Sequence, residues 1–349
     1  MKLTWSRFDL RFKVPGGTSR GVLHAKETFF IRIESENRTG IGECGLFRGL
    51  SHDDRPDYEA KLNWLSQNID KHPEWLKQEL ADYPSMVFGL EQALVSLNSR
   101  SQFELFPSDF TLGKAKIPIN GLVWMGDKQF MQEQIKEKLK AGFKVIKMKI
   151  GAIDFETEIG LLKSLREQFS EDEIEIRVDA NGAFSPAEAL EKLKRLSDYS
   201  IHSIEQPIKP RQLDDMAELC ASSPIPVALD EELIGLTTPS TREELLNHVK
   251  PSYLIFKPSL IGGMAVCDHW IALCKSHGIG WWITSALESN IGLNAIAQYT
   301  YTLNNPMPQG LGTGGLFTNN ISSPLFVKGG ALGYDPEINW GDTSVLLGE

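Results

Sequence analysis

Six charged side chains recur through the middle of the chain, each at the end of an apolar, β-branched run of residues. They are Lys147 and Lys149, the carboxylates Asp179, Glu205 and Asp230, and finally Lys257. From Lys149 onward they follow one another at about 25–30 residues, the length of one strand, one helix and their connections. Because β-branched and apolar runs favour strands, we expect the charged groups to lie at successive strand ends.

The three carboxylates could hold a metal ion. Oxygen ligands without cysteine or histidine select a hard cation, and Mg²⁺ with some waters still bound is the best match, with Mn²⁺ as the alternative. A single acid at a strand end can equally cap a helix or pair with a lysine. Three acids at equivalent strand ends, flanked by lysines on both sides, favour the metal site.

The flanking lysines are suited to proton transfer. Lys147 and Lys149 are two residues apart, so a strand points both toward the same face. An ordinary lysine, with a pKa of about 10.4, is protonated at neutral pH. A divalent cation and a second ammonium nearby both disfavour the charged form, which lowers the pKa of a lysine toward values useful for a base. One lysine could then remove a proton α to a carboxylate, while the metal stabilises the enediolate that forms.

Four further residues are weaker candidates for the site. Arg177 precedes Asp179 by two residues and faces the same interior, where it could orient the metal ligands, contact an anionic substrate or form a buried ion pair. We expect Asn181 to support the metal ligands. Ser285 closes the seventh predicted strand and could help to shape the pocket. Gly262 opens a helix whose free backbone N–H groups could receive an anion.

The composition excludes several classes of partner. The chain has 349 residues and a formal net charge of −10, which argues against nucleic acid and anionic membranes. The four cysteines form no Cys-x-x-Cys pair and have no histidine cluster near them, so neither zinc nor disulfides are expected. The N-terminus has no apolar signal segment. We therefore expect a cytoplasmic protein that acts on a small-molecule carboxylate, and the sequence leaves homo-oligomer formation open.

Two folding units are expected from the length and the pattern. Residues 1–115 combine alternating strands with helices over about 56–101, which is typical of an α+β capping domain. Loops are predicted at 14–20, between the first two strands, and at 46–55. We expect both loops to close over the substrate.

From residue 116 to 317 strands and helices alternate. The expected strands lie near 117–123, 144–150, 174–180, 201–205, 226–230, 252–257, 280–284 and 308–311. Eight such units favour a closed (β/α)8-type TIM barrel with its chemical residues at the strand C-termini. A barrel, unlike an open sheet, also brings Lys149 and Lys257 face to face. The final segment, 318–349, is expected to return and pack on the capping domain.

These residues together resemble the enolase superfamily, in its muconate-lactonizing-enzyme-like subgroup. Members of that subgroup carry a Lys-x-Lys on the second barrel strand, metal-binding Asp, Glu and Asp on the third to fifth, and a lysine on the sixth. The matching positions here are Lys147 and Lys149, then Asp179, Glu205 and Asp230, and Lys257. The resemblance covers nearly the whole chain and implies a capped barrel and a Mg²⁺-dependent enzyme.

Within the subgroup, the chain is most similar to the dehydratases of menaquinone biosynthesis, lyases that convert a cyclohexadiene carboxylate to the aromatic o-succinylbenzoate. The stretches 285–292 and 309–314 carry this similarity. It implies that Lys149 is the base that takes the α-proton and then assists loss of hydroxide as water. It also implies that Lys257 stabilises the enediolate as a cation and that Lys147 tunes Lys149.

The chain departs from its relatives in two places, and rival functions exist on the same scaffold. Asp-Glu-Ser, common among relatives, is replaced by Asp230-Glu231-Glu232, which leaves Glu232 without an assigned role. No Asp-x-Asp follows the seventh strand, as it usually does in dipeptide epimerases. An N-acylamino acid racemase or a cycloisomerase is the main rival, because Lys149 and Lys257 could both act as bases. A barrel that binds a ligand without catalysis is the third alternative, and the intact set of lysines and carboxylates disfavours it.

Overall fold

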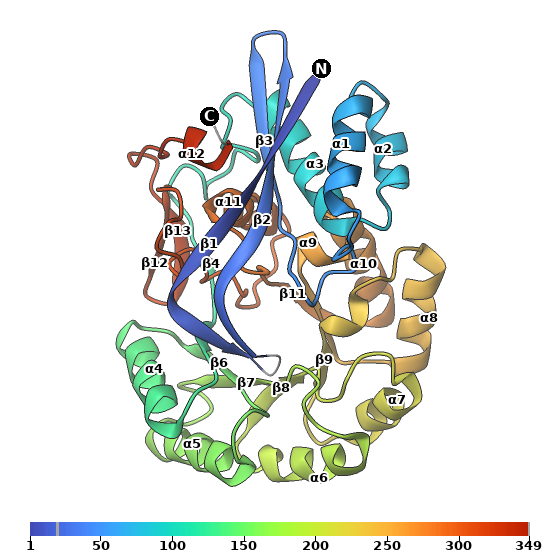
Figure 1. Ribbon diagram of the computed structural model, residues 1–349. Helices are drawn as coiled ribbons and strands as arrows, with labels where there is room; N and C mark the ends of the chain where they lie inside the picture. The colour runs from blue at the N-terminus through green and yellow to red at the C-terminus, as the bar shows by residue number, and fades with distance from the viewer. Residues whose placement is uncertain (19–20, 348–349) are drawn as a thin grey trace.

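The computed structural model describes residues 1–18 and 21–347 and contains two parts (Figure 1). Two long strands and a shorter third strand, all antiparallel, form the N-terminal part together with three helices. A larger layer of parallel strands, covered on its outer side by helices, forms the second part. Residues 309–310 form isolated bridges beside this sheet, and a C-terminal hairpin belongs to a separate three-stranded sheet.

The N-terminal part is built on β1 (Lys2–Thr18), β2 (Gly21–Ser35) and β3 (Arg38–Cys44), paired antiparallel in that order. Helices α1 (Tyr58–Asn68), α2 (Pro73–Glu79) and α3 (Pro84–Asn98) follow. Alternate strand residues such as Phe29, Ile31 and Ile33 are fully buried in one cluster with helix residues that include Leu62 and Leu90. The alternating pattern therefore gives the sheet one apolar face, which the helices cover.

The segment predicted as a loop at 14–20 is strand as far as Thr18, so that prediction is wrong for residues 14–18. β1 continues into it and pairs with β2 after one register shift. A Cβ at Gly17 would lie 2.4 Å from the backbone oxygen of Met125. Glycine therefore permits close packing of the extended hairpin on the second part instead of a flexible turn. Residues 19–20 lie outside the described residues.

Seven parallel strands form the second sheet, in the order β11-β10-β9-β8-β7-β6-β5. They are β5 (Gly121–Val123), β6 (Val145–Lys149), β7 (Glu175–Asp179), β8 (Ile201–Glu205), β9 (Val227–Leu229), β10 (Tyr253–Phe256) and β11 (Gly280–Ile283). The helices between and after them are α4 (Lys128–Lys140), α5 (Phe155–Gln168), α6 (Pro186–Ser197), α7 (Leu213–Ser222), α8 (Pro239–Val249), α9 (Pro258–Ile261), α10 (Met264–His277) and α11 (Asn290–Thr302), with a 3₁₀ turn at Glu231–Leu233. The predicted alternation of strand and helix is confirmed for these seven strands. No helix among residues 1–18 and 21–347 is long and apolar enough to cross a membrane.

Side-chain caps fix where several of these helices begin. The side chains of Asp127, Asp154 and Thr238 each accept a hydrogen bond from the backbone N–H three residues later. Ser185 forms a capping box with Glu188 at the start of α6. These bonds satisfy N–H groups that have no partner inside the helix, so the loops that follow the strands end at defined residues.

The first and last predicted strands of the second part differ from expectation. The segment 117–123 is split, because β4 (Ile117–Pro118) pairs with a C-terminal hairpin while β5 joins the parallel sheet. Proline lacks the N–H that a continuous central strand would need, which explains a break near Pro118. The segment 308–311 forms only isolated bridges, from Gln309 to Ile119 and from Gly310 to Thr284.

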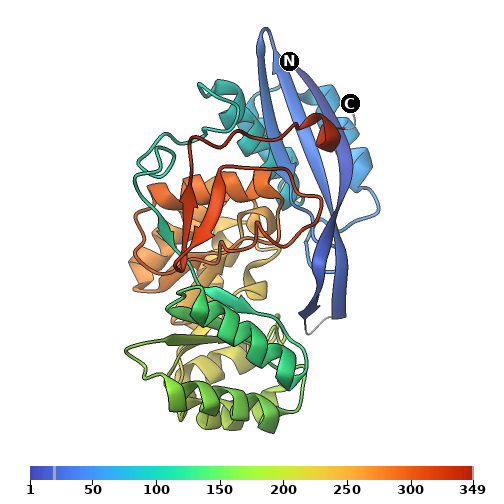
Figure 2. The same ribbon diagram turned by 90° about the vertical axis from the view of Figure 1, so that its left-hand side faces the viewer.

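The C-terminal segment contacts both parts. The hairpin β12 (Leu325–Lys328) and β13 (Ala331–Tyr334) forms a three-stranded sheet with β4. The chain then crosses to the N-terminal sheet, where α12 (Ser344–Leu347) lies against β1 and β2 (Figure 2). Trp340 stacks on Phe103 with ring centroids 4.2 Å apart along this path. The tail therefore bridges the two parts.

Replacement of Gly42 by alanine tests the close packing of α3 on β3. An added Cβ would lie 2.0 Å from the backbone oxygen of Gly89, and the backbone cannot move aside without separating the two elements. We expect Gly42→Ala to lower the free energy of unfolding by about 1–3 kcal/mol, measured by chemical denaturation. Gly160→Ala is the matched control, because nothing lies within 4 Å of its added Cβ and alanine favours the helix. Unchanged stability of Gly42→Ala would contradict this packing.

Candidate active site

The charged residues predicted for the site lie together at the C-terminal ends of neighbouring parallel strands. The row contains Lys147 and Lys149 on β6, Asp179 on β7, Glu205 on β8, Asp230 after β9 and Lys257 after β10. The strand register pairs Lys149 with Asp179, and Asp179 with Glu205. The parallel sheet therefore sets the side-by-side arrangement of residues that are far apart in the sequence.

Two lysines share the carboxylates at the β6 side of the row. The Nζ of Lys147 lies 2.9 Å from Oδ2 of Asp179 and also pairs with Glu205. The Nζ of Lys149 donates at 2.6 Å to the same Oδ2 of Asp179 and at 2.6 Å to Oδ1 of Asn181. All four charged side chains are buried. Each buried charge is therefore compensated by a neighbour of opposite sign.

Lys257 occupies the other end of the row. Its ammonium donates to Oδ2 of Asp230. The strands β7, β8 and β9 lie between the strand that carries Lys149 and the strand that precedes Lys257. The two lysines therefore approach the site from different strands, separated by the row of carboxylates.

The mutual contacts shift the proton affinities of the buried groups. Burial acts to raise the pKa of Asp179, but the ammonium groups of Lys147 and Lys149 outweigh burial and hold that pKa well below its ordinary value. Burial and then the neighbouring Asp179 raise the pKa of Glu205 well above its ordinary value. Burial opposes the charged form of Lys147, but the two carboxylates outweigh it and raise the pKa of that lysine. The two carboxylates therefore favour the charged form of Lys147, while Glu205 has a raised affinity for a proton.

The donor atoms fit a hard cation, although their arrangement differs from the shared ligand set expected. In the part of the chain that the structure describes, no three acidic, histidine or cysteine side chains are grouped as a metal site. The reason is that Lys147 lies between Asp179 and Glu205, while Asp230 turns to Lys257. The buried Oε1 of Glu205 has no hydrogen-bond partner. A buried carboxylate oxygen without a partner, beside two further carboxylates, is suited to a divalent ion.

A cavity of about 430 Å³ opens onto this row. The side chains of Lys147, Lys149 and Lys257 line it, together with Asn181 and Ser285. Its apolar wall includes Phe47, Leu50, Leu260, Leu287 and Leu316. Residues from both predicted loop segments, among them Val14 and Leu50, line the cavity as well. The cavity therefore combines reactive amines with an apolar surface that suits a ring-containing carboxylate.

Asn181 and Ser285 both line the cavity. Asn181 donates its Nδ2 hydrogen to Oε1 of Glu231 at 2.9 Å while its Oδ1 accepts from Lys149. The hydroxyl oxygens of Ser285 and Thr313 lie 2.6 Å apart at the cavity wall. Glu231 and Thr313 were not predicted, although each lies inside a stretch that the sequence singles out.

Arg177 is not among the residues that line the cavity, and its contacts match the ion pair that the sequence also allowed. Its Nε donates to Glu175 at 2.7 Å and its Nη1 to the carbonyl of Pro308 at 3.0 Å. The guanidinium also lies 4.4 Å from the ring centroid of Trp282. Arg177 precedes Asp179 on the strand and therefore lies one layer deeper in the interior, where the alternative of a buried ion pair holds.

Gly262 does not offer free N–H groups to a substrate, so that prediction is wrong. The N–H groups of Gly262 and Gly263 donate to the carbonyl of Pro258. The next amide, that of Met264, donates to Oε2 of Glu91, which reaches the start of α10 from α3. Burial raises the pKa of Glu91 to about 7. The hydrogen-bond acceptor at this helix end is thus a side chain of the N-terminal part, which no local sequence signal indicates.

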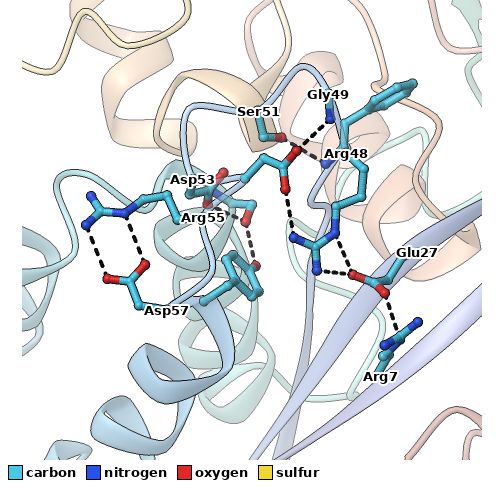
Figure 3. A network of polar contacts seen from close by, with 12 residues as sticks. Arg7, Glu27, Arg48, Gly49, Ser51, Asp53, Arg55 and Asp57 are labelled. Carbon is cyan, nitrogen blue, oxygen red and sulfur yellow. Dashed lines mark hydrogen bonds and ion pairs between the residues drawn. The ribbon is translucent and has the colours of Figure 1, made fainter.

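A network of charged residues holds the loop over 46–55 (Figure 3). Arg48 donates to Glu27 on β2 and, at 2.7 Å, to Asp54. Asp54 also accepts the N–H of Gly49 at 2.7 Å, and Glu27 pairs with Arg7 at 2.7 Å. The loop that supplies part of the cavity wall is thereby tied to the sheet of the N-terminal part.

Asp53, at the base of this loop, predicts a specific pH dependence of stability. Its Oδ2 accepts hydrogen bonds from the N–H and hydroxyl of Ser85 at 2.9 and 2.6 Å. Burial raises the pKa of Asp53 to about 6 despite these bonds. The folded state therefore keeps a proton that the unfolded chain releases, so this stabilisation is present below a pH of about 4 and is lost as the pH rises through about 6.

We expect Asp53→Asn to remove that contribution. The free energy of unfolding is measured for both proteins by chemical denaturation at each pH. The wild-type value minus the variant value should fall by roughly 2–3 kcal/mol between pH 4 and pH 7. Asp172→Asn, at an exposed position, should keep the wild-type pH dependence. Parallel pH curves for wild type and Asp53→Asn would refute the assignment.

Comparison with known proteins identifies the family of this chain. Residues 130–332 match the family described as enolase C-terminal domain-like. An o-succinylbenzoate synthase from Desulfotalea psychrophila is 48% identical and is matched over 95% of this chain and 99% of its own length. The crystal structure of MenC from Desulfotalea psychrophila has a TM-score of 0.85 and 45% identity, covering 95% of this chain and 99% of that chain.

More distant structures share the fold alone. The substrate-liganded L-Ala-D/L-Glu epimerase from Bacillus subtilis has a TM-score of 0.82 at 18% identity, covering 98% of this chain and 97% of that chain. The match of the family over more than half of the chain and the nearly full-length identity to one relative go further than fold. This chain belongs to the enolase superfamily, in the family of the o-succinylbenzoate synthases.

Proposed function

We propose that this chain is a Mg²⁺-dependent lyase that forms o-succinylbenzoate in menaquinone biosynthesis. The substrate is a cyclohexadiene carboxylate, which loses its α-proton and then water. The observation that carries the proposal is one cavity lined by Lys149 and Lys257, which approach it from strands on either side of three carboxylates. Relatedness to the o-succinylbenzoate synthases supports the choice of product. Cytoplasmic location and self-association stay predictions from the sequence.

The carboxylates of Asp179, Glu205 and Asp230 are the groups that would hold the metal. Enolase superfamily enzymes use a divalent metal, and an all-oxygen donor set suits Mg²⁺. When bound, the ion supplies positive charge that stabilises an enediolate. For the three carboxylates to converge, Lys147 and Lys257 must release some of their present contacts with them.

Lys149 is the proposed base. Its Nζ lines the cavity and is held by Asp179 and the neutral oxygen of Asn181. It takes the α-proton, the electron pair of the broken C–H bond moves into the ring and carboxylate, and the C–OH bond then breaks as the ring becomes aromatic. The proton on Lys149 goes to the departing hydroxide and gives water, so the amine is regenerated. Lys147, which shares Asp179 with Lys149, tunes it.

Lys257 is the proposed cation on the opposite face. Burial acts to lower its pKa, but Asp230 and then Glu205 outweigh burial and raise it. It therefore stays protonated and can face the negative charge of the enediolate. The apolar wall excludes water, which strengthens that interaction.

We also propose that the parallel sheet closes into a (β/α)8-type barrel through residues 309–310. The N–H of Gln309 donates to Pro118 and its carbonyl accepts from Asn120, at 2.8 and 3.0 Å. On the other side the N–H of Gly310 donates to Ile283 at 2.8 Å. Backbone bonds on both sides of one segment support an eighth strand position. The division into a capping domain 1–115, a barrel 116–317 and a tail 318–349 is part of this proposal.

A racemase acting on N-acylamino acids is the second candidate. Lys149 and Lys257 line the same cavity from different strands, and a racemase needs one base on each face of the substrate. Exchange of the α-proton of an N-acylamino acid with deuterium from solvent would reveal this activity. Turnover of the cyclohexadiene carboxylate without such exchange would rule out the racemase activity and support the lyase activity.

Lys149→Ala tests the base. We expect kcat for dehydration to fall by about 10²–10⁴-fold or more, because the proton acceptor is lost, while folding and Mg²⁺ binding remain. The loss of the cyclohexadiene substrate can be followed spectrophotometrically. Lys163→Ala, at an exposed position on α5, is the control and should retain full activity. Substantial residual turnover by Lys149→Ala would assign the proton to another group.

Glu205→Gln tests the metal ligand. An amide lacks the negative charge that a hard cation requires, so we expect the Kd for Mg²⁺, measured by calorimetry on protein treated with a chelator, to rise by about tenfold or more. Glu218→Gln on the exposed side of α7 should bind Mg²⁺ as the wild type does. An unchanged response to Mg²⁺ would remove Glu205 from the ligand set.

A further inference from the structure

Two buried polar residues that touch no part of the cavity lie directly beside two of the carboxylates. Gln206 follows Glu205 at the end of β8, and Glu232 lies two residues after Asp230 at the end of β9. Both side chains are fully buried, with an exposed fraction of 0%. Neither lines the cavity. A contact with substrate therefore does not account for the burial of these two polar side chains.

The Gln206 amide joins the ends of β8 and β9. Its Oε1 accepts the backbone N–H groups of Asp230 and Glu232, both at 3.2 Å. Its Nε2 donates to Oε2 of Glu232 at 3.2 Å and to the carbonyl of Ile208 at 3.1 Å. One side chain next to Glu205 thus binds the backbone amide of Asp230, which fixes the distance between these two strand ends.

The Glu232 carboxylate completes the connection. Its Oε1 accepts the backbone N–H of Arg211 at 2.7 Å, and its Oε2 accepts from Gln206. The guanidinium of Arg211 donates in turn to the backbone carbonyls of Glu232, at 3.1 Å, and Ile234. Both carboxylate oxygens are used as acceptors, and both donors lie on the connection that follows β8.

Backbone strain shows that this connection needs support. Gln206 and Arg211 have φ values of 41° and 72°, in the left-handed region that side chains other than glycine rarely adopt. Such conformations cost of order 1–3 kcal/mol each and persist only where surrounding bonds hold them. The bonds to Glu232 are made at these two residues. The pair of side chains therefore compensates strain immediately after Glu205.

We propose that Gln206 and Glu232 are positioning residues that set the separation of Glu205 and Asp230 and thereby the affinity for the divalent metal. This inference rests on the proposed function only in taking those two carboxylates as ligands. It also gives a role to Glu232, which the sequence left without one. Outer partners of metal ligands act in this way, since they hold the ligands at one geometry before the ion binds.

Glu232→Gln is the sharpest test, because it keeps the shape and removes one acceptor. Its new NH₂ group must face either the N–H of Arg211 or the NH₂ of Gln206, and two donors cannot bond each other. We expect the Kd for MgCl₂, measured by calorimetry on the chelator-treated full chain, to rise about 10–100-fold. At saturating Mg²⁺, kcat should stay within about threefold of the wild type, since no reacting group is changed. Glu244→Gln on α8, which is exposed, is the matched control.

A swapped pair provides a rescue. Gln206→Glu combined with Glu232→Gln again places one amide opposite one carboxylate, so the bonds to Asp230 and Arg211 can re-form, although the bond from residue 206 to the carbonyl of Ile208 is lost. We expect this double variant to bind Mg²⁺ more tightly than Glu232→Gln alone. If Glu232→Gln weakened Mg²⁺ binding only by lowering the stability of the whole fold, exchanging the two side chains would not restore the Kd.

The outcomes separate this inference from the proposed function. If Glu205→Gln weakens Mg²⁺ binding while folded Glu232→Gln keeps the wild-type Kd, the positioning role is refuted and the ligand assignment stands. If Glu205→Gln itself leaves the Kd unchanged, the ligand assignment fails first. Should Glu232→Gln not fold, Glu232→Asp is measured instead. Its shorter side chain cannot reach both partners, so a wild-type Kd in that variant overturns the proposal.

Discussion

The site depends on mutual compensation of charges that are buried at the ends of β6 to β10. An ammonium or a carboxylate alone in this interior would lose several kcal/mol of hydration and would change its protonation state. Ion pairs reduce this cost. Lys147 pairs with Asp179 and Glu205, and Lys257 pairs with Asp230. Parallel strands with matched C-terminal ends supply the spacing that allows it, since one strand separation brings neighbouring side chains within ion-pair distance. The spacing of the parallel strands therefore determines which buried charges can pair at the site.

The N-terminal part is held against the second part by two carboxylates, which accept backbone N–H groups at the N-termini of two helices of the second part. Glu43 on β3 accepts the N–H groups of Ser289 and Gly292 at 3.0 and 2.9 Å, at the start of α11. Glu91 on α3 does the same for Met264 at α10. Helix N-termini attract negative charge, so these contacts fix the cap at one orientation over the strand ends. That orientation brings the loop over 46–55 to the cavity wall, where the charged network around Arg48 holds it.

The sequence predicted the reactive row because local patterns determine it: apolar runs define the strands, and each charged residue ends one. It failed or left alternatives open where the answer depends on depth or on distant partners. Arg177 shares the face of Asp179, but pattern gives the face and not the depth along a strand. Gly262 precedes a helix N-terminus that Glu91 occupies from a segment far away in the sequence. Glycine and proline at 14–18 indicated a turn, whereas packing on Met125 kept the strand extended.

The two lysines at the cavity have unequal surroundings, and this asymmetry favours different tasks. Lys257 has the carboxylate of Asp230 to itself, with Glu205 and Glu231 adding negative charge, which favours a permanent cation. Lys149 shares Asp179 with Lys147 and has the uncharged oxygen of Asn181 as its second partner. Fewer carboxylates therefore lie around the ammonium of Lys149 than around that of Lys257, as the proposed roles of base and cation require.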